Sequence, residues 1–335
     1  MKNPRIAIVG AGAVGGITAA VLKKSGYDVK LVTKHPEVAK KISSEGMHVF
    51  GKCGDISIKI PSVASVSDLD GKYDFAFIAT KGYDMVSVAK DLLPFLDENS
   101  RIISMQNGIC EEELAKIVST QRTIGCVVGW GATMHEPATS EMTSAGEFVI
   151  GNWERERDEK LIEIMKMLNP IAPVKITDNI LSERYSKLIV NSCITTLGAI
   201  SGLLLGKMLM MKKARNLFIR IIEEAMQVAN KMGINVPPYA GKLDYYKFLG
   251  NGFFAGLKRH ITILVIGFKY RKLKSSSLQS LERGKRTEVD NYNGYITRKG
   301  MEFGVETPVN KKLIEMVKEI EAGKSEISPQ NIINF

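Results

Sequence analysis

The sequence has few of the residues that build metal centres or disulfide-stabilised folds. Its four cysteines are scattered without a C-x-x-C pair, and its four histidines show no metal-ligand spacing. We therefore expect neither disulfides nor a metal site. The first residues also lack the charged start, apolar run and cleavage site of a secretory leader, and this favours a cytoplasmic location.

A membrane-spanning segment is the next feature that the sequence argues against. No charged residue lies between Lys187 and Lys207, and that length approaches the roughly 20 residues of a spanning helix. Five polar side chains of the segment would enter hydrocarbon at a cost: Asn191, Ser192, Thr195, Thr196 and Ser201. We expect a buried helix instead, and no membrane association.

The net charge of +10 does not by itself indicate a nucleic-acid partner. Basic residues are spread along the whole chain, and sequence motifs of DNA- or RNA-binding proteins are missing. We expect no nucleic acid, because an anionic substrate and a polyphosphate cofactor suit a positive field equally well. With 335 residues, 44% of them hydrophobic, the chain is long enough for two cores and so for two domains.

The first half of the chain alternates between strand and helix patterns. Residues 5–10 form a nearly all-apolar run, which is typical of a parallel strand buried on both faces. A helix over 13–25 and a strand over 28–33 complete a β-α-β unit. Further strands and helices are expected over 47–60, 74–80, 85–96, 101–105, 111–118, 123–128, 147–150 and 173–177. This pattern predicts an α/β domain, residues 1–178, with a Rossmann-type doubly wound sheet.

After Asp178 the strand signals mostly stop. Helices are predicted over 181–205, 214–231, 243–271, 278–303 and 310–321. We therefore expect an all-α domain over 179–323, followed by a frayed tail at 324–335. Residues 248–274 are unusually long, basic and apolar for this pattern, and we assign them no role beyond the mouth of the substrate site.

A glycine-rich turn follows the first predicted strand and opens the first predicted helix. It matches G-x-G-x-x-G with Gly10, Ala11, Gly12, Ala13, Val14 and Gly15. The first glycine allows a tight turn, the second lets the backbone approach a pyrophosphate, and the third lets helix pack close to strand. Free N–H groups at the start of the helix then bind phosphate. The sequence thus predicts a dinucleotide cofactor.

The end of the second strand favours NADPH over NADH. An acidic side chain there would bind the ribose 2′-hydroxyl, whereas a cation would accept the 2′-phosphate. The sequence has Thr33, Lys34 and His35 at this point. Glu37 is close enough to keep NADH as an alternative.

The helix predicted over 181–205 carries one polar stripe. Lys187, Asn191 and Thr195 are spaced i, i+4 and i+8, and so line one face. An ammonium group without a partner on a buried helix costs several kcal/mol, so the stripe needs a ligand or a structural carboxylate partner. The residues alone do not decide between a ligand and a structural carboxylate partner.

Further motifs follow the glycine-rich turn in this order: Ala79-Thr80-Lys81, Gln106-Asn107-Gly108, the K-x-x-x-N of Lys187 and Asn191, Ser276, Thr287-Glu288-Val289-Asp290 and Asn293-Gly294. With these motifs the chain resembles the ketopantoate reductase (2-dehydropantoate 2-reductase) family over nearly its whole length. The family also places a cation as far beyond its first glycine as Lys34 lies beyond Gly10.

The resemblance implies that Lys187 is a general acid, which donates a proton to the substrate carbonyl as hydride arrives from NADPH. A site shielded from water would lower the pKa of this lysine from its usual ~10.4 toward working pH. Asn191 and Ser276 would bind the substrate hydroxyl and carboxylate. Glu288 would act as a counter-charge, or as a ligand for the substrate hydroxyl or the cofactor.

The resemblance also implies three cofactor contacts outside the glycine loop. Asn107 would touch the nicotinamide ribose or the substrate, and Lys81 and Ala132 would border the cofactor. Thr195 departs from the family, which commonly has a second asparagine there; the hydroxyl loses the reach and the two donors of the amide.

We therefore expect an NADPH-dependent reductase of a small anionic 2-oxo acid, with ketopantoate first, held between the domains with its carbonyl at Lys187. The Thr195 change motivates one alternative, a related reductase of another 2-oxo acid or of an imine. A non-catalytic NADPH-sensing module is the other. The oligomeric state stays open, with a homodimer among the possibilities.

Overall fold

The structure is a computed structural model that describes residues 3–154 and 158–335. The chain forms two compact units, which divide between Leu181 and Ser182. This division falls in the first turn of α6 (Ile180–Ser201). Within the described ranges, no helix is long and apolar enough to cross a membrane.

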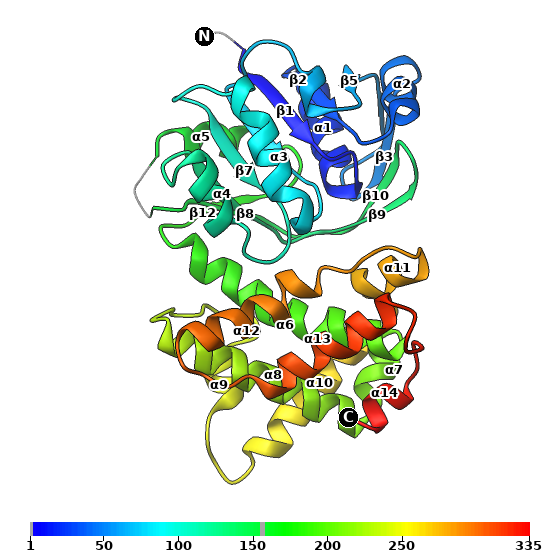
Figure 1. The fold of residues 1–335 in the computed structure, drawn as a ribbon, viewed down its shortest axis with the longest axis vertical. Helices are drawn as coiled ribbons and strands as arrows, with labels where there is room; N and C mark the ends of the chain where they lie inside the picture. The colour runs from blue at the N-terminus through cyan, green and yellow to red at the C-terminus, as the bar shows by residue number, and fades with distance from the viewer. Residues whose placement is uncertain (1–2, 155–157) are drawn as a thin grey trace. The chain divides into compact units, whose positions relative to one another are not determined.

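Unit 1 is built on an eight-stranded sheet with the order β12-β11-β8-β7-β6-β1-β2-β5 (Figure 1). Its strands are β1 (Arg5–Val9), β2 (Asp28–Val32), β5 (Ser62–Val63), β6 (Phe75–Ile78), β7 (Arg101–Ser104), β8 (Thr123–Val128), β11 (Phe148–Asn152) and β12 (Val174–Ile176). The strands from β5 to β8 in this order are parallel, and β11 is antiparallel to β8. Strand order reverses at β1, between β2 and β6, and ligands of such sheets bind at that switch point.

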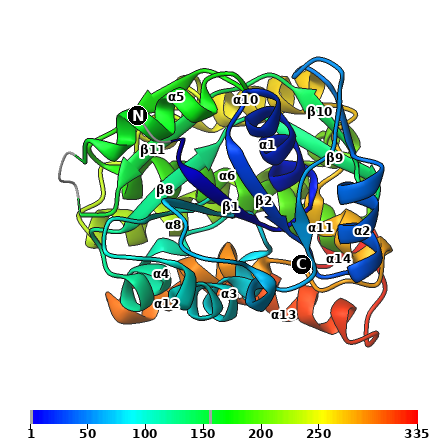
Figure 2. The same cartoon turned by 90° about the horizontal axis from the view of Figure 1, so that it is seen from above.

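Helices cover both faces of this sheet, as the continuous apolar runs require. Ile6 and Ile8 belong to a core with α1 (Ala13–Lys24) and α5 (Lys160–Leu168). Ala7 and Val9 point the other way, into a core with α3 (Met85–Leu92) and α4 (Glu111–Val118). Figure 2 shows the two pairs of helices on opposite sides of the strands. The predicted doubly wound sheet is confirmed.

A second, four-stranded sheet packs on the α1 side with the order β4-β3-β10-β9. The residues 47–60, where the alternating pattern around Gly51 and Gly54 is typical of a hairpin, form one from β3 (Met47–Gly51) and β4 (Ile56–Ile58). Strands β9 (Gly131–Glu136) and β10 (Thr139–Ser144) were not predicted, because β9 is partly or fully exposed along its length and lacks an apolar alternation. Helix α5 and helix α2 (Pro36–Ser44) were also missed.

Unit 2 is helical, so the predicted fold class of an α/β domain followed by an all-α region holds. Besides α6, its helices are α7 (Leu205–Met210), α8 (Lys212–Lys231), α9 (Tyr245–Leu249), α10 (Ala255–Lys269), α11 (Ser276–Glu282), α12 (Asn293–Glu302), α13 (Pro308–Glu321) and α14 (Gln330–Ile333). The predicted helix over 181–205 ends early, at Gly202, whose φ of 70° reverses the chain.

Three further predictions for unit 2 are wrong. The helix expected over 243–271 is divided into α9 and α10 by the non-helical residues 250–254. The helix expected over 278–303 is interrupted, because Gly284 has a φ of 63° and a 3-10 turn at Val289–Asn291 precedes α12. The tail is not frayed either. The Ser328 N–H and the Asn331 amide donate to the carbonyl of Ile200, at 3.1 and 2.8 Å. These bonds hold the C-terminal segment against the end of α6, and Ile332 is buried.

A buried polar network joins four helices of unit 2. The Glu224 carboxylate of α8 accepts from the Val309 and Asn310 N–H groups at the start of α13, at 2.8 and 3.0 Å. The Asn293 amide of α12 donates to Asn310 Oδ1 at 2.8 Å, and Thr196 of α6 donates to Asn293 Oδ1 at 2.5 Å. Asn293, which matched a family motif, therefore has a structural role.

Candidate nucleotide edge and polar helix face

The central strands of unit 1 end in register at one edge of the sheet. Val9 pairs with Val32 of β2 and with Ile78 of β6, and Ile78 pairs with Ser104 of β7. The residues that follow these strands therefore meet at the switch point. Five of the predicted cofactor residues come shortly after one of these four strands. They are Gly10, Thr33, Lys34, Lys81 and Asn107.

Each glycine of the loop has a separate structural reason. Gly10 has a φ of 114°, and a Cβ there would lie 2.8 Å from the carbonyl of Ala79, the residue that follows β6. A Cβ on Gly15 would lie 2.0 Å from the Gly10 oxygen. At Gly12, by contrast, a Cβ would have nothing within 4 Å, so the surface beside it is open to a ligand.

The start of α1 has the features of a phosphate site. Gly12 is its N-cap and provides no side-chain cap, and the first turn holds no acidic residue. The first N–H groups of a helix need external acceptors and favour an anion. Ala11 and Val14 pack against the core below, which holds the loop in place. The residues present therefore fit a dinucleotide pyrophosphate.

Lys34 has a partner that the sequence did not reveal. Its Nζ lies 2.7 Å from the carboxylate of Asp84, at the end of a 3-10 turn after β6. Lys34 itself is largely exposed. His35 faces Glu37, with 3.6 Å between Nδ1 and the carboxylate. The acidic residue nearest the predicted 2′-phosphate partner is thus Asp84, which lies 50 positions away in the chain.

The other predicted cofactor residues take different positions. Lys81 directly precedes the 3-10 turn, and Asn107 is half-buried beyond β7. Ala132 lies on β9 and packs against the core shared with α1. Thr80 was not predicted. Its Oγ1 is buried and lacks a hydrogen-bond partner in the described part of the chain, which normally costs about 1–3 kcal/mol unless a ligand or water satisfies it.

In unit 2, α6 keeps one face partly exposed. From Ser182 to Ile200 its residues are buried except Glu183, Lys187, Asn191 and Ile194. These four positions are spaced i, i+4, i+8 and i+11, so they lie along one stripe. The Lys187 and Asn191 side chains therefore share the accessible face of the helix, as predicted from their spacing.

Thr195 is less available than its two neighbours on the stripe. It is buried, and its hydroxyl donates to the Asn191 carbonyl at 2.6 Å. This bond uses the only donor of the side chain. The Ser275 hydroxyl in turn donates to the Thr195 carbonyl at 3.3 Å. The start of α11 thus lies against this turn of α6.

The remaining predicted substrate residues follow in α11 and the turn before α12. Ser276 is exposed in the first turn of α11, whereas its neighbour Ser275 is the buried N-cap. Glu288 is buried, with its carboxylate 3.4 Å from the Tyr292 hydroxyl.

Asp290 of the same motif belongs to an ion-pair cluster. Burial acts to raise its pKa, but hydrogen bonds from Lys318 and Arg286 outweigh burial and hold the pKa below its ordinary value. The carboxylate is thus tied to two cations within unit 2. The motif that the sequence singled out as functional is therefore partly structural.

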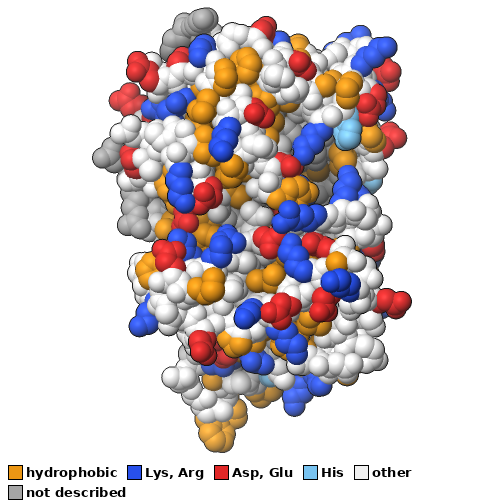
Figure 3. Space-filling model, viewed as in Figure 1, with side chains coloured by type: hydrophobic (Ala, Val, Ile, Leu, Met, Phe, Trp, Pro, Cys, Tyr) orange, Lys and Arg blue, Asp and Glu red, His pale blue; other side chains and the backbone are white. Residues whose placement is uncertain are grey.

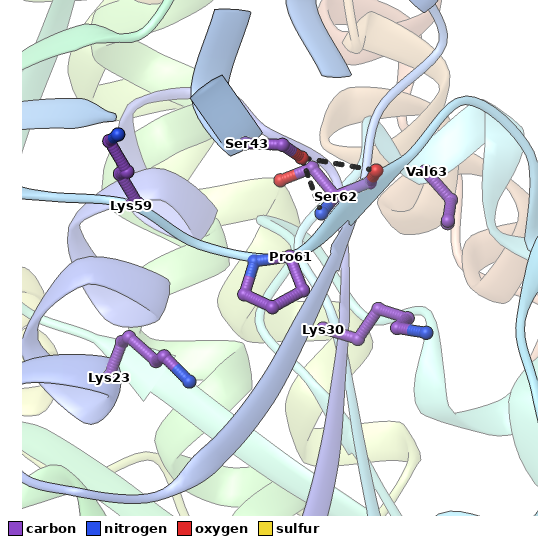
Figure 4. A pocket seen from close by; sticks show the side chains of 7 residues that line it. All are labelled: Lys23, Lys30, Ser43, Lys59, Pro61, Ser62 and Val63. Carbon is purple, nitrogen blue, oxygen red and sulfur yellow. Dashed lines mark hydrogen bonds between the residues drawn. The ribbon is translucent and has the colours of Figure 1, made fainter. Parts of the chain in front are cut away.

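A hollow of about 550 Å³ elsewhere in unit 1 has no comparable organisation. It is lined by Lys23, Lys30, Ser43, Lys59, Pro61, Ser62 and Val63. In Figure 4 the three ammonium groups point in different directions, and Lys30 is already bound to Asp70 at 2.7 Å. Figure 3 likewise shows Lys and Arg side chains spread over the visible face of the molecule rather than gathered in one patch.

Comparisons with known proteins match both units of the chain to one family. The N-terminal model of the family described as ketopantoate reductase PanE/ApbA matches residues 6–155, and its C-terminal model matches residues 179–321. The chain belongs to the ketopantoate reductase family. It is an oxidoreductase similar to 2-dehydropantoate 2-reductases, and the resemblance drawn from the sequence motifs is confirmed.

Relatives match over nearly their whole length. The 2-dehydropantoate 2-reductase of Pyrococcus horikoshii is 29% identical over 94% of this chain and 96% of that protein. The crystal structure of a family member from Ralstonia eutropha has a TM-score of 0.82 and 26% identity, with 96% of this chain and all of that chain covered. The fold is also shared by a D-mandelate dehydrogenase solved with NADH and anilino(oxo)acetate, with a TM-score of 0.81, 22% identity and 96% and 99% coverage.

Proposed function

We propose that this protein reduces a small 2-oxo acid with NADPH, and that the acid is 2-dehydropantoate, which becomes pantoate. The observation that carries the proposal is the stripe of α6, where Lys187 and Asn191 occupy the accessible face of an otherwise buried helix. Family membership and the fitted glycine loop of unit 1 support it.

The residues at the nucleotide edge suit NADPH. The loop from Gly10 to Gly15 would hold the pyrophosphate, and Thr33 and Lys34 would meet the adenosine ribose with its 2′-phosphate. Lys81, Asn107 and Ala132 would border the rest of the cofactor, and the unsatisfied Thr80 hydroxyl adds a polar group at the same edge. NADPH supplies the hydride for the reduction.

Lys187 would supply the proton. A carbonyl carbon that accepts a hydride leaves negative charge on its oxygen, and an ammonium group within hydrogen-bond reach stabilises that charge and donates a proton. Asn191, one turn along the same face, would orient the substrate hydroxyl. Ser276 and Glu288 would bind the substrate carboxylate and a hydroxyl of substrate or cofactor.

One observation favours a second substrate class. The donor of Thr195 is committed to the helix backbone, so the stripe offers two hydrogen-bond donors fewer to a hydroxylated substrate than an asparagine would. A 2-oxo acid without the hydroxyl of ketopantoate, or an imine, needs fewer donors. The same machinery would reduce it.

Nicotinamide oxidation, followed by absorbance, separates these possibilities. We expect the fastest turnover with ketopantoate and NADPH, in a panel that includes aliphatic and aromatic 2-oxo acids and their imines. Rapid turnover of another acid, with none of ketopantoate, would replace the substrate and keep the reductase. Tight NADPH binding with no turnover of any carbonyl or imine would instead identify a sensing module.

A further inference from the structure

Thr80 has a buried hydroxyl that packing alone does not explain. The residue comes two positions after β6 ends, and its Oγ1 has no hydrogen-bond partner within residues 3–154 and 158–335. An unpaired buried hydroxyl destabilises a folded protein. Valine has nearly the same shape and lacks the polar atom, so it would fill this position without that penalty. The hydroxyl therefore indicates a partner that does not belong to the chain.

The backbone of Thr80 lies against the glycine loop. A Cβ on Gly10 would come within 2.9 Å of the Thr80 nitrogen, and a Cβ on Gly15 would come within 2.9 Å of the Ala79 Cβ. The Ala79 N–H donates to the Val9 carbonyl at 2.8 Å, which continues the pairing of β1 and β6 past the last residue of β6. Thr80 is thus held beside the loop that fits a pyrophosphate.

Strand order decides which half of a dinucleotide Thr80 would meet. Strand β2, which is followed by Thr33 and Lys34, lies on one side of β1, and β6 lies on the other. With the 2′-phosphate over β2 and the pyrophosphate at the loop after β1, the rest of NADPH extends over β6. Neighbouring strands are ~4.8 Å apart, so Thr80 is one strand away from the pyrophosphate. The group bonded to the pyrophosphate on that side is the nicotinamide ribose.

A ribose suits the chemistry of this side chain. Each sugar hydroxyl can donate or accept a hydrogen bond, and so can the hydroxyl of threonine. Thr80 is only half-buried as a residue, although its Oγ1 is buried. One staggered step about its Cα–Cβ bond redirects the hydroxyl without moving the backbone. A ligand can therefore recruit the hydroxyl by side-chain rotation.

We propose that Thr80 is a cofactor-binding residue whose hydroxyl bonds to the nicotinamide ribose of NADPH. The inference rests on the proposed function, because it requires a nicotinamide dinucleotide on unit 1. It adds a side-chain contact to those expected from Lys81 and Asn107. The same hydroxyl makes the free protein less stable and the complex with NADPH tighter.

Thr80→Val tests the proposal, because it removes the hydroxyl and nearly keeps the shape. Without cofactor, the melting temperature should rise by roughly 2–4 °C, since the unpaired buried hydroxyl is gone. The Kd for NADPH, measured by calorimetry, should rise about fivefold, since one hydrogen bond to the cofactor is lost. Thr80→Ser keeps the hydroxyl, and its Kd should stay within about twofold of the wild type.

Thr123→Val is the matched control. Thr123 is also a buried threonine of the eight-stranded sheet, but it begins β8 at the edge opposite the nucleotide edge. Its Oγ1 donates to the Ser119 carbonyl at 2.7 Å. This substitution should lower the melting temperature, because it removes a hydrogen bond, and should leave the Kd for NADPH unchanged. The two valine variants should thus shift stability in opposite directions, and only Thr80→Val should weaken NADPH.

Adenosine 2′,5′-bisphosphate locates the contact. This compound has the adenosine and 2′-phosphate of NADPH and lacks the nicotinamide ribose. Its Kd should be the same for the wild type and for Thr80→Val. A fivefold loss for this compound as well would place the hydroxyl at the adenosine half and reject the ribose as its partner.

Two further results would overturn the proposal while leaving the proposed function intact. The first is an unchanged Kd for NADPH in Thr80→Val. The second is a lower melting temperature of this variant without cofactor, which would show that the hydroxyl is already satisfied in the free protein. A wild type that binds neither NADPH nor NADH would instead reject the proposed function, and this inference with it.

Discussion

The nucleotide edge of unit 1 and the polar face of α6 in unit 2 are formed by different kinds of atoms. At the nucleotide edge, backbone atoms define the candidate site. The strands end in register, and at Gly10 and Gly15 a Cβ would collide with neighbouring backbone atoms. On α6, side chains define the candidate site, because the helix backbone bonds within the helix and the accessible face carries the polar side chains of Glu183, Lys187 and Asn191.

This difference predicts which kind of substitution damages each region. A backbone site should be damaged by adding atoms, since a Cβ has no room at two of its glycines. A side-chain site should be damaged by removing functional groups, while the helix that carries them persists. Substitutions in the two regions should therefore separate cofactor binding and folding from chemistry.

The largest effect is expected at Lys187. Lys187→Ala should lower kcat by roughly 10² to 10⁴, because the proton donor is lost, while the affinity for NADPH stays close to that of the wild type. Lys231→Ala, at the exposed end of α8, is the control and should leave both constants unchanged. Turnover that survives Lys187→Ala would show that the α6 face is not the chemical half of the site.

The glycine loop should give the next largest effect, split between two variants. Gly15→Ala places a Cβ 2.0 Å from the Gly10 oxygen, so we expect unfolding to become easier by about 1–3 kcal/mol. Gly12→Ala meets nothing within 4 Å, so its melting temperature should stay near that of the wild type. Its Kd for NADPH should rise about tenfold, or ~1.4 kcal/mol, because the methyl group occupies the approach of the phosphate.

Thermal melts and fluorescence titrations with NADPH measure these two changes. Equal loss of stability in both variants would contradict the separate roles of the two glycines. Unchanged NADPH affinity in Gly12→Ala would mean that the pyrophosphate does not lie beside this residue.

Asn293 sharpens the comparison from within unit 2. Asn293→Ala removes the link between Thr196 and Asn310 and leaves buried polar groups without partners. The free energy of unfolding should fall by about 1–3 kcal/mol, with KM for the substrate nearly unchanged. Urea denaturation and steady-state kinetics check this. A large rise in KM with normal stability would return Asn293 to the substrate site.

The smallest effects are expected at the Lys34–Asp84 pair. Lys34→Glu should weaken NADPH by about tenfold, or ~1.4 kcal/mol, relative to NADH. Asp84→Asn should strengthen NADPH by less than about fivefold, since an exposed ion pair is worth at most ~1 kcal/mol and the 2′-phosphate no longer competes with a carboxylate. Titrations with both nucleotides measure the ratio. Weaker NADPH binding in Asp84→Asn would show that Asp84 positions Lys34 instead.

Prediction from the sequence succeeded where the pattern is local. The apolar runs of β1 and β6 and the glycine turn before α1 follow from neighbouring residues. The stripe of Lys187 and Asn191 follows from helical spacing. Prediction failed where a distant segment decides. Strand β9 is ordered by pairing with β10, and the C-terminal segment is held by the Ile200 carbonyl.

The candidate site divides in the same way. The spacing of Gly10 and Lys34 was visible in the sequence, but Asp84 was not, because register brings the ends of β2 and β6 together across 50 positions. Ser275 and Ser276 look alike in the sequence. Only the packing of α11 on α6 shows that Ser275 is buried beside Thr195 while Ser276 is exposed.

The sequence by itself determined the two-unit order, the fold class and the glycine loop. Periodicity and steric demands of single residues act over a few positions and need no partner. Tertiary structure decided which polar groups are free to bind a ligand. The Thr195 hydroxyl donates to the helix backbone, the Asn293 amide donates to Asn310 in the core, and Lys34 forms an ion pair with Asp84. A hydrogen bond or ion pair depends on which atoms the fold brings within about 3 Å, and no local pattern contains that information.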